Sequence, residues 1–256
     1  MTQTPRFSDL EGASVFITGG GSGIGAALTE GFLAQGAKVA FVQRSDATAF
    51  CDEMQAATGA RPHHMACDIT DTKRLRACIA EAGEKHGNIT VLVSNAANDK
   101  RHETLEVTEE FYDWSQSINL KSYFFTAQAA IPQMQAAGGG SIINFSSVSY
   151  MMGNAGYPVY AASNAGITGL TRALAREFGP DRIRVNALMP GWVMTQKQKD
   201  MWVTPEALKN QLDRQCLQDT LEPSDIVGGT LFLASNASRM MTGQALVIDG
   251  GVVVTG

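Results

Sequence analysis

The sequence SVFITGGGSGIG, residues 14–25, decides the fold. Its first five residues favour a β-strand, and apolar residues at helical spacing begin at Ile24. The turn between them is rich in glycine. A pyrophosphate needs such a turn, because bare backbone N–H groups at a helix N-terminus must reach it with no Cβ in the way. Gly19 suits the tight turn, Gly23 the close approach of the phosphates and Gly25 the packing of helix on strand, so the stretch predicts a dinucleotide-binding fold.

Apolar runs of strand length recur along the rest of the chain, and helical patterns separate them. The expected strands are residues 14–18, 39–42, 64–67, 89–94, 142–146, 184–188 and 246–248; the main expected helices are 24–35, 72–86, 108–136, 160–178 and 223–233. Alternating strands and helices predict parallel strands with right-handed crossovers. We therefore expect an α/β fold, a single Rossmann-fold domain over residues 1–256, with a doubly wound parallel sheet and helices on both faces. Residues 193–217 fit the alternation least well and are expected to form a substrate lid.

The composition excludes several classes of protein. The 256 residues carry a net charge of -5, so nucleic acid is not an expected partner, because phosphate binding needs a basic face. No stretch of about 18 apolar residues exists to span a membrane, and the first ten residues lack the apolar run of a secretory signal. The four cysteines are scattered without metal-binding spacing. We expect a cytoplasmic protein with reduced cysteines, no metal site and no membrane partner.

The spacing T-G-x-x-x-G-x-G over residues 18–25 resembles the motif of the short-chain dehydrogenase/reductase family, and the likeness continues across nearly the whole chain. Residues 94–97, SNAA, resemble its N-N-A-G segment, with Ser and Ala in place of the first Asn and the Gly. Residues 190–195, PGWVMT, resemble its P-G-x-x-x-T stretch beside the nicotinamide, and Asp68 its adenine-contacting acid. The resemblance implies a nicotinamide nucleotide held by Gly19, Ser22, Gly23, Ile24, Gly25, Arg44, Ser45, Asp68, Ile69, Asn95, Pro190, Gly191, Val193 and Thr195.

The end of the second strand bears on the choice between NADP and NAD. An acid there accepts hydrogen bonds from the adenosine ribose and repels a 2′-phosphate. In this chain the position is Gln43, followed by Arg44 and Ser45, whose guanidinium and hydroxyl suit a phosphate. We expect NADP to be preferred. NAD stays open as the alternative, because a shift of the loop could bring Asp46 to the ribose and because Ser22 is not basic.

The catalytic residues implied by the resemblance include one departure from the family. Ser147 lies 13 residues before Tyr160, which is the family's spacing for its catalytic pair, and Asn119 matches its helix-kinking active-site Asn. The family also has a Lys four residues after the Tyr, one helical turn away, and this chain has Asn164. A neighbouring opposite charge shifts a pKa by about one to three units. Losing it cuts the phenolate fraction near neutrality by about 10- to 1000-fold.

Several explanations of Asn164 remain open. One is that the enzyme is slow. Another is that a cation from the substrate or a mobile loop takes the place of the lysine. A third is that Asn164 was introduced to disable the enzyme. A further alternative is a catalytically impaired protein that binds nucleotide as a sensor or oligomeric partner. A methyl- or phosphoryl-transfer enzyme on the same fold is disfavoured by Ser147, Tyr160 and their spacing.

Two segments resemble the sugar (aldose) 1-dehydrogenase branch of the family: residues 98–102, NDKRH, and residues 195–217. A polyol needs many donors and acceptors, and an indole offers a flat face to sugar C–H groups. We expect Asn98, Asn154, Gln196 and Trp202 to contact a small-molecule alcohol or carbonyl substrate, with a sugar as the favoured one. The resemblance also implies a homotetramer, packed through residues 108–136 and 160–178.

Overall fold

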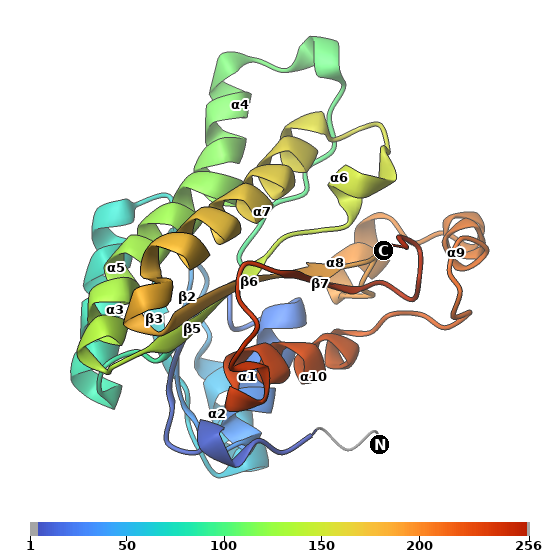
Figure 1. The fold of residues 1–256 in the computed structure, drawn as a ribbon. Coiled ribbons are helices and arrows are strands. Elements are labelled where there is room, and N and C mark those ends of the chain that lie inside the picture. Colours follow the sequence, from blue (N-terminus) through green and yellow to red (C-terminus); the bar gives the residue numbers. More distant parts are fainter. Residues whose placement is uncertain (1–4, 255–256) are drawn as a thin grey trace.

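The computed structural model describes residues 5–254, which build one seven-stranded sheet with helices on both faces (Figure 1). Every strand pair is parallel, and the order across the sheet is β3-β2-β1-β4-β5-β6-β7. The strands are β1 (Ser14–Thr18), β2 (Lys38–Gln43), β3 (His63–Ala66), β4 (Val91–Ser94), β5 (Gly140–Phe145), β6 (Ile183–Pro190) and β7 (Ala245–Ile248). The predicted doubly wound α/β fold is confirmed, and each expected strand overlaps an observed one.

Alternate residues of the strands feed two hydrophobic cores, one on each face of the sheet. In β1, Val15 and Ile17 pack into one core and Phe16 into the other, because successive side chains of a strand point to opposite faces. One face is covered by α1 (Gly23–Ala34), α2 (Thr48–Thr58) and α10 (Pro223–Ala234); the other by α3 (Thr72–His86), α5 (Ser122–Ala136) and α7 (Pro158–Phe178). A sheet buried on both faces explains why its strands are almost continuously apolar.

The chain order creates a crevice at the carboxyl ends of β1 and β4. After β1 the chain builds outward through β2 and β3, and it then returns to place β4 on the other side of β1. The loops that follow these two neighbouring strands therefore leave in opposite directions. Ligands of open α/β sheets bind at such a switch point. The glycine turn follows β1, so the topology brings it beside the loop after β4.

The helical pattern predicted over residues 108–136 is found as two helices, and the break lies at Asn119, where the resemblance implied a kinked helix. The structure has α4 (Glu109–Gln116) and α5, joined by one turn of π-helix over Ser117–Lys121. An extra residue in the turn redirects the side chains that follow, and π-turns occur mostly at functional sites. Here the buried Asn119 lies inside the turn and bonds to the loop after β4. The side-chain amide of Asn119 must point at the loop after β4 to form these bonds, which explains why the helix is interrupted here.

Residues 193–217 contain two short helices outside the alternation of strands and helices, α8 (Gln196–Met201) and α9 (Pro205–Leu212). Figure 1 shows them beyond the same end of the sheet as α6 (Ser149–Met152). Among the helices of residues 5–254, none has both the length and the apolar character that a membrane crossing requires. All four cysteines are free thiols.

Candidate active site

A cavity of about 1170 Å³ runs along the carboxyl end of the sheet, from the glycine turn to α8. Every residue predicted to bind the cofactor lines it except Gly23. Of the predicted catalytic residues, Ser147 and Tyr160 line it, whereas Asn119 and Asn164 lie behind its wall. The cavity thus brings together residues from the loops after β1, β2, β3, β4, β5 and β6.

The glycine turn is shaped to receive an anion. Gly19 and Gly23 have left-handed φ values of +73° and +53°, which favour glycine. A Cβ on Gly25 would collide with the carbonyl oxygen of Gly19. Ser22 stands at the N-cap of α1 without a side-chain cap hydrogen bond, and the first turn holds no acidic residue. The free N–H groups and the positive end of the helix dipole therefore face the cavity, as a pyrophosphate requires.

Asn95 fastens the loop after β4 to the glycine turn. Its backbone N–H and that of Ala96 donate to Thr18 Oγ1 at 2.9 and 3.1 Å. Its side-chain Nδ2 donates to the carbonyl oxygens of Thr18 and Gly19 at 3.1 and 3.2 Å. Thr18, which precedes the glycines in the motif, therefore has a structural role, because it fixes the two loops of the crevice to each other.

The adenosine end of the cavity is lined by the residues after β2 and β3. Arg44 lies 4.0 Å from Asp68, and its side chain is 75% exposed, so it is free to turn towards a phosphate. Gln43 donates to the side chain of Ser45 at 3.2 Å. Asp46, the residue that left NAD open, does not line the cavity. Its carboxylate accepts from the backbone and hydroxyl of Thr48 at 3.2 and 2.7 Å, at the start of α2.

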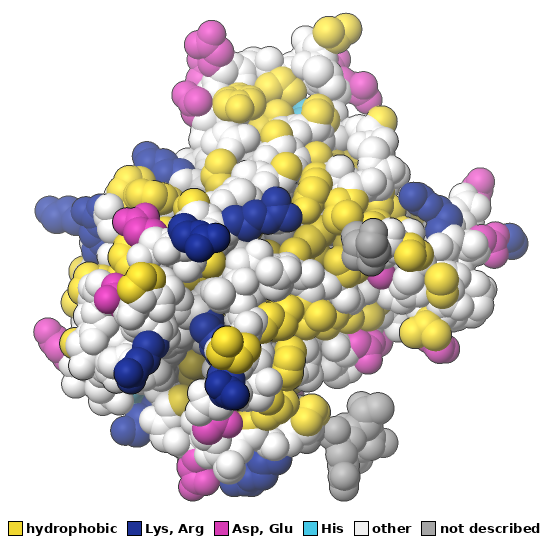
Figure 2. Space-filling model, in the orientation of Figure 1, with side chains coloured by type: hydrophobic (Ala, Val, Ile, Leu, Met, Phe, Trp, Pro, Cys, Tyr) yellow, Lys and Arg dark blue, Asp and Glu magenta, His cyan; other side chains and the backbone are white. Residues whose placement is uncertain are grey.

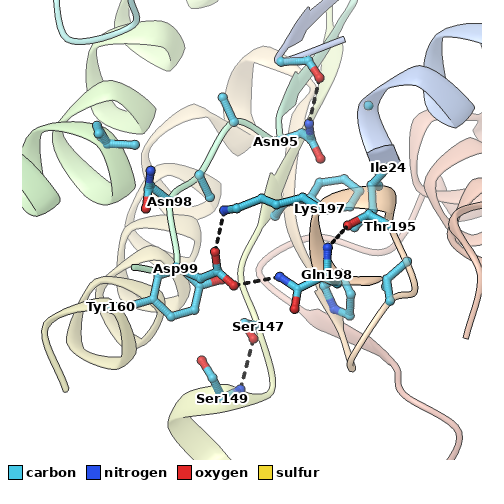
Figure 3. A pocket seen from close by; sticks show the side chains of 18 of the residues that line it. Ile24, Asn95, Asn98, Asp99, Ser147, Ser149, Tyr160, Thr195, Lys197 and Gln198 are labelled. Carbon is cyan, nitrogen blue, oxygen red and sulfur yellow. Dashed lines mark hydrogen bonds and ion pairs between the residues drawn. The ribbon is translucent and has the colours of Figure 1, made fainter. Parts of the chain in front are cut away.

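Tyr160 and Ser147 meet at the centre of the cavity, Tyr160 from the first turn of α7 and Ser147 from the loop after β5. Burial and then the negative charge of Asp99 raise the pKa of Tyr160 to about 12, while the neighbouring amide of Asn164 and hydroxyl of Ser147 pull it down in part. Ser147 Oγ accepts from the backbone of Ser149 at 3.1 Å, which fixes its position (Figure 3). A serine hydroxyl and a phenol side by side can hold an alcohol oxygen and exchange a proton with it.

The side chain of Asn119 forms hydrogen bonds with the loop after β4. Its Oδ1 accepts from the backbone N–H of Asn98 at 2.8 Å, and its Nδ2 donates to the Asn98 carbonyl at 3.0 Å and to Ser115 Oγ at 3.2 Å. These bonds clamp the backbone of Asn98 from both sides. The structure therefore makes Asn119 a positioning residue for this loop.

The predicted substrate residues divide into two groups. Asn98, Asn154 and Trp202 line the cavity. Gln196 does not: it lies on the outer side of α8 and donates to Asp200 at 2.7 Å. Helical geometry explains the difference, because neighbouring residues of one turn face different sides.

The structure adds charged and polar residues that the sequence prediction missed. Asp99 accepts from Lys197 Nζ at 2.7 Å and from Gln198 Nε2 at 2.8 Å, across the cavity (Figure 3). The guanidinium carbon of Arg101 lies 3.9 Å from the ring centroid of Tyr157 and 5.4 Å from that of Trp202. Each of these residues lies close in sequence to a predicted one. The sequence analysis identified the segments that line the cavity. Only the folded backbone shows which of their side chains point inward.

Comparison with known proteins agrees with this geometry. Residues 19–253 match the family model described as "Enoyl-(Acyl carrier protein) reductase". The chain is 48% identical over 249 residues to a protein of Rhizobium meliloti (strain 1021) named "Probable galactose dehydrogenase", covering 96% of this chain and 97% of that protein. It is 41% identical over 246 residues to a D-xylose 1-dehydrogenase of Caulobacter vibrioides, with coverage of 96% and 97%.

A solved structure shares the fold. The crystal structure of a blue fluorescent protein from a metagenomic library, in complex with NADPH, superposes with a TM-score of 0.87 at 34% identity. The match covers 96% of this chain and 100% of that one. The fold of this chain is therefore shared with a protein whose crystal structure holds NADPH.

Proposed function

The chain belongs to the short-chain dehydrogenase/reductase family, and on that premise we propose that it is an NADP-preferring dehydrogenase that oxidises the C1 hydroxyl of an aldose sugar. It is an NAD(P)-dependent oxidoreductase acting on an alcohol or carbonyl group. The alternative of a catalytically impaired sensor finds no support among its relatives, which are named as dehydrogenases. The family membership gives the reaction class; the sugar, the preference for NADP and the residue roles are the proposal.

The observation that carries this proposal is the continuity of the cavity. Its one end is a phosphate cradle at the glycine turn, its middle holds Ser147 and Tyr160, and its other end is lined by carboxylate, amide, ammonium and indole groups. A sugar is recognised by many such donors and acceptors together with an aromatic face. The residues present fit a nicotinamide nucleotide, since the turn after β1 has the shape of a phosphate cradle and could not keep it with a side chain at Gly25.

The chemistry of the site follows from these positions. When bound, the nicotinamide nucleotide supplies the hydride acceptor for oxidation of the alcohol carbon. Ser147 Oγ holds the substrate oxygen, and Tyr160 Oη, as phenolate, takes the hydroxyl proton as the C–H bond is broken. The hydroxyl of Tyr160 returns a proton in the opposite direction. Because burial and the charge of Asp99 raise the pKa of Tyr160 to about 12, phenolate is a minor form near neutrality, and we expect the reaction to speed up as the pH rises.

The preference for NADP rests on Arg44. The position from which an acid would accept from the ribose hydroxyls is occupied by Gln43 at the end of β2, and Asp46 is engaged at the start of α2. An exposed guanidinium beside the cavity can bind a 2′-phosphate with two hydrogen bonds. Those two facts favour NADP over NAD.

An assembly and a location complete the proposal. Large hydrophobic side chains on α4 and α5 are exposed, among them Tyr112, Trp114 and Phe124. Figure 2 shows hydrophobic side chains spread over the region of α4 and α7. Exposed apolar area of this kind marks interaction surfaces. It supports a homotetramer packed through these helices, and we place this tetramer in the cytoplasm as a single-domain enzyme whose residues 193–217 act as the lid.

A panel of aldoses tests the function. We expect NADPH to form with NADP⁺ and a hexose or pentose aldose, and the rate to fall at least 100-fold in Tyr160→Phe. Asn164→Lys, assayed in parallel, supplies the charge that this chain lacks. Failure of both the protein as it stands and Asn164→Lys to oxidise any aldose, with NADPH still bound, would overturn the sugar assignment.

A further inference from the structure

The cavity contains a carboxylate whose negative charge disfavours the phenolate that the proposed reaction requires. Asp99, in the loop after β4, points into the cavity beside Tyr160 (Figure 3). Its side chain is 23% exposed. A carboxylate near a phenol disfavours phenolate, because two negative charges then share a poorly hydrated space. With a neutral Asn164 on the other side, nothing at the family's lysine position offsets this charge.

The offset comes instead from the lid. Lys197 reaches across from α8, and its Nζ lies 2.7 Å from Asp99 Oδ1. Gln198 of the same helix donates to Asp99 Oδ2 at 2.8 Å and accepts from Trp192 Nε1 at 2.8 Å, so the second carboxylate oxygen is held as well. Burial disfavours the charge of Asp99, but the hydrogen bond and charge of Lys197, with the bond from Gln198, lower the pKa of Asp99. Asp99 is therefore ionised and neutralised by one ammonium.

The other groups around Tyr160 do not replace this ammonium. Ser147 and Asn164 are neutral hydrogen-bonding partners, and Tyr157 and Tyr123 are phenols. Arg101 is the remaining cation on this side of the cavity among residues 5–254, and its guanidinium lies over the ring of Tyr157. Among the described residues that face Tyr160, Asp99 is the one carboxylate, and Lys197 is the cation bonded to it.

We propose that Lys197 is a positioning residue for proton transfer: from the lid it pairs with Asp99, shields Tyr160 from that negative charge, and so makes Tyr160 competent when the lid is seated. This rests on the proposed function, since it concerns the proton step of the dehydrogenase. Lys197 acts through Asp99 and touches no reacting atom. The arrangement couples two events, because α8 seated over the cavity brings the ammonium of Lys197 to Asp99.

Loss of Lys197 should change charge without releasing the lid. The segment from Thr195 to Trp202 keeps its N-cap bond from Gln198 N to Thr195 Oγ1 and the stacking of Trp202 near Arg101. Lys199 offers a matched control on the same helix. Its ammonium lies 3.4 Å from Glu222, and it does not line the cavity.

The test follows the ionisation of Tyr160 directly. Protein labelled with ¹³C at tyrosine Cζ is titrated by NMR, free and then with NADP⁺, and the Tyr160 signal is identified by its loss in Tyr160→Phe. Lys197→Met should move the Tyr160 titration about 0.5–1 pH unit upward, and Lys197→Arg should restore it. Asp99→Asn should move it downward. In the Asp99→Asn background, Lys197→Met should move the titration less than in the parent protein, because no carboxylate then holds the ammonium near Tyr160.

Kinetics give the second readout. In the pH range where kcat rises with pH, Lys197→Met should be about 3- to 10-fold slower than the parent protein at a given pH. This is the rate change that corresponds to the expected shift of the Tyr160 titration. Lys199→Met should match the parent protein in both measurements. An unmoved titration in Lys197→Met overturns the proposal, as does an equal shift in the Asp99→Asn background. Failure of the dehydrogenase assignment would look different, since no aldose would be oxidised while the titration still responded.

Discussion

The side-chain amide of Asn164 donates to the backbone carbonyl of Tyr160 at 2.9 Å, one turn earlier on α7. The amide is buried and is turned onto its own helix. It therefore occupies the place from which a lysine would project an ammonium towards the phenol, and it brings no charge. The raised pKa of Tyr160 comes first from burial and then from Asp99, and Asn164 supplies no charge to offset them.

Asn164→Lys should raise the oxidation rate near neutrality. A cation here favours the phenolate of Tyr160, whose pKa of about 12 should fall by about one to three units. Phenolate accumulates as pH rises towards that pKa, so lowering it moves the rising limb of the kcat profile to lower pH. We expect kcat at pH 7 to increase about 10- to 1000-fold. Asn164→Gln is the neutral control and should leave the limb unmoved; an equal gain in Asn164→Gln would show that charge is not the cause.

Gly25→Ala should abolish tight binding of the nucleotide. Its Cβ would collide with the carbonyl oxygen of Gly19, so the turn cannot keep the shape that exposes its N–H groups. We expect the Kd for NADPH, measured by fluorescence titration, to rise more than 10-fold. Gly228→Ala, in α10 and outside the helices proposed to form the tetramer, is the matched control, because its added Cβ comes no closer than 3.8 Å to Pro5. That variant should bind NADPH normally. Because alanine replaces glycine inside a helix, it should also gain about 0.5–1 kcal/mol of stability. Unchanged binding in Gly25→Ala would contradict the phosphate cradle.

The fold could be predicted from the sequence because its signals are local and repeated. Strands buried on both faces are short apolar runs, and the glycine turn between β1 and α1 has a composition that few other structures need. The turn of π-helix at Asn119 leaves no mark in the apolar pattern, and only the resemblance to the family implied a kinked helix there. A helical pattern continues through it, and the reason for the break is a bond to Asn98, 21 positions away.

The cofactor half of the site was also more predictable than the substrate half. Cofactor contacts are made by loops at the ends of strands, whose position follows from the sheet. Substrate contacts depend on which side of a short helix faces inward. Gln196 is a predicted contact that points out, whereas Lys197 is not among the predicted residues and reaches Asp99, 98 positions earlier in the chain. A contact of that sequence separation is visible only when both loops have been placed.

Arg44→Ala should weaken the binding of NADPH and leave that of NADH nearly unchanged. The guanidinium is 75% exposed beside the cavity, and its loss removes a charge-assisted partner of the 2′-phosphate, which NADH lacks. A hydrogen bond to a charged group contributes about 1.5–3 kcal/mol, so the Kd for NADPH should rise roughly 10- to 100-fold. Arg76→Ala is the control, since Arg76 stacks on Phe125 away from the cavity. Equal losses for both nucleotides would contradict the assignment of Arg44 to the phosphate.

Asn119→Ala should destabilise the protein and impair substrate binding together. The change leaves the backbone N–H and carbonyl of the half-buried Asn98 without their partners, and each such loss costs up to about 1–3 kcal/mol. The loop that carries Asp99 is then free to move, so KM for the sugar should rise more than the Kd for NADPH. Ser115→Ala removes the third bond of the same amide but leaves the clamp on Asn98 intact. It should therefore cost clearly less in urea unfolding and should leave KM unchanged. If both variants lost the same stability with KM unmoved, Asn119 would serve only the packing of the π-turn, and the positioning of the loop would have to come from elsewhere.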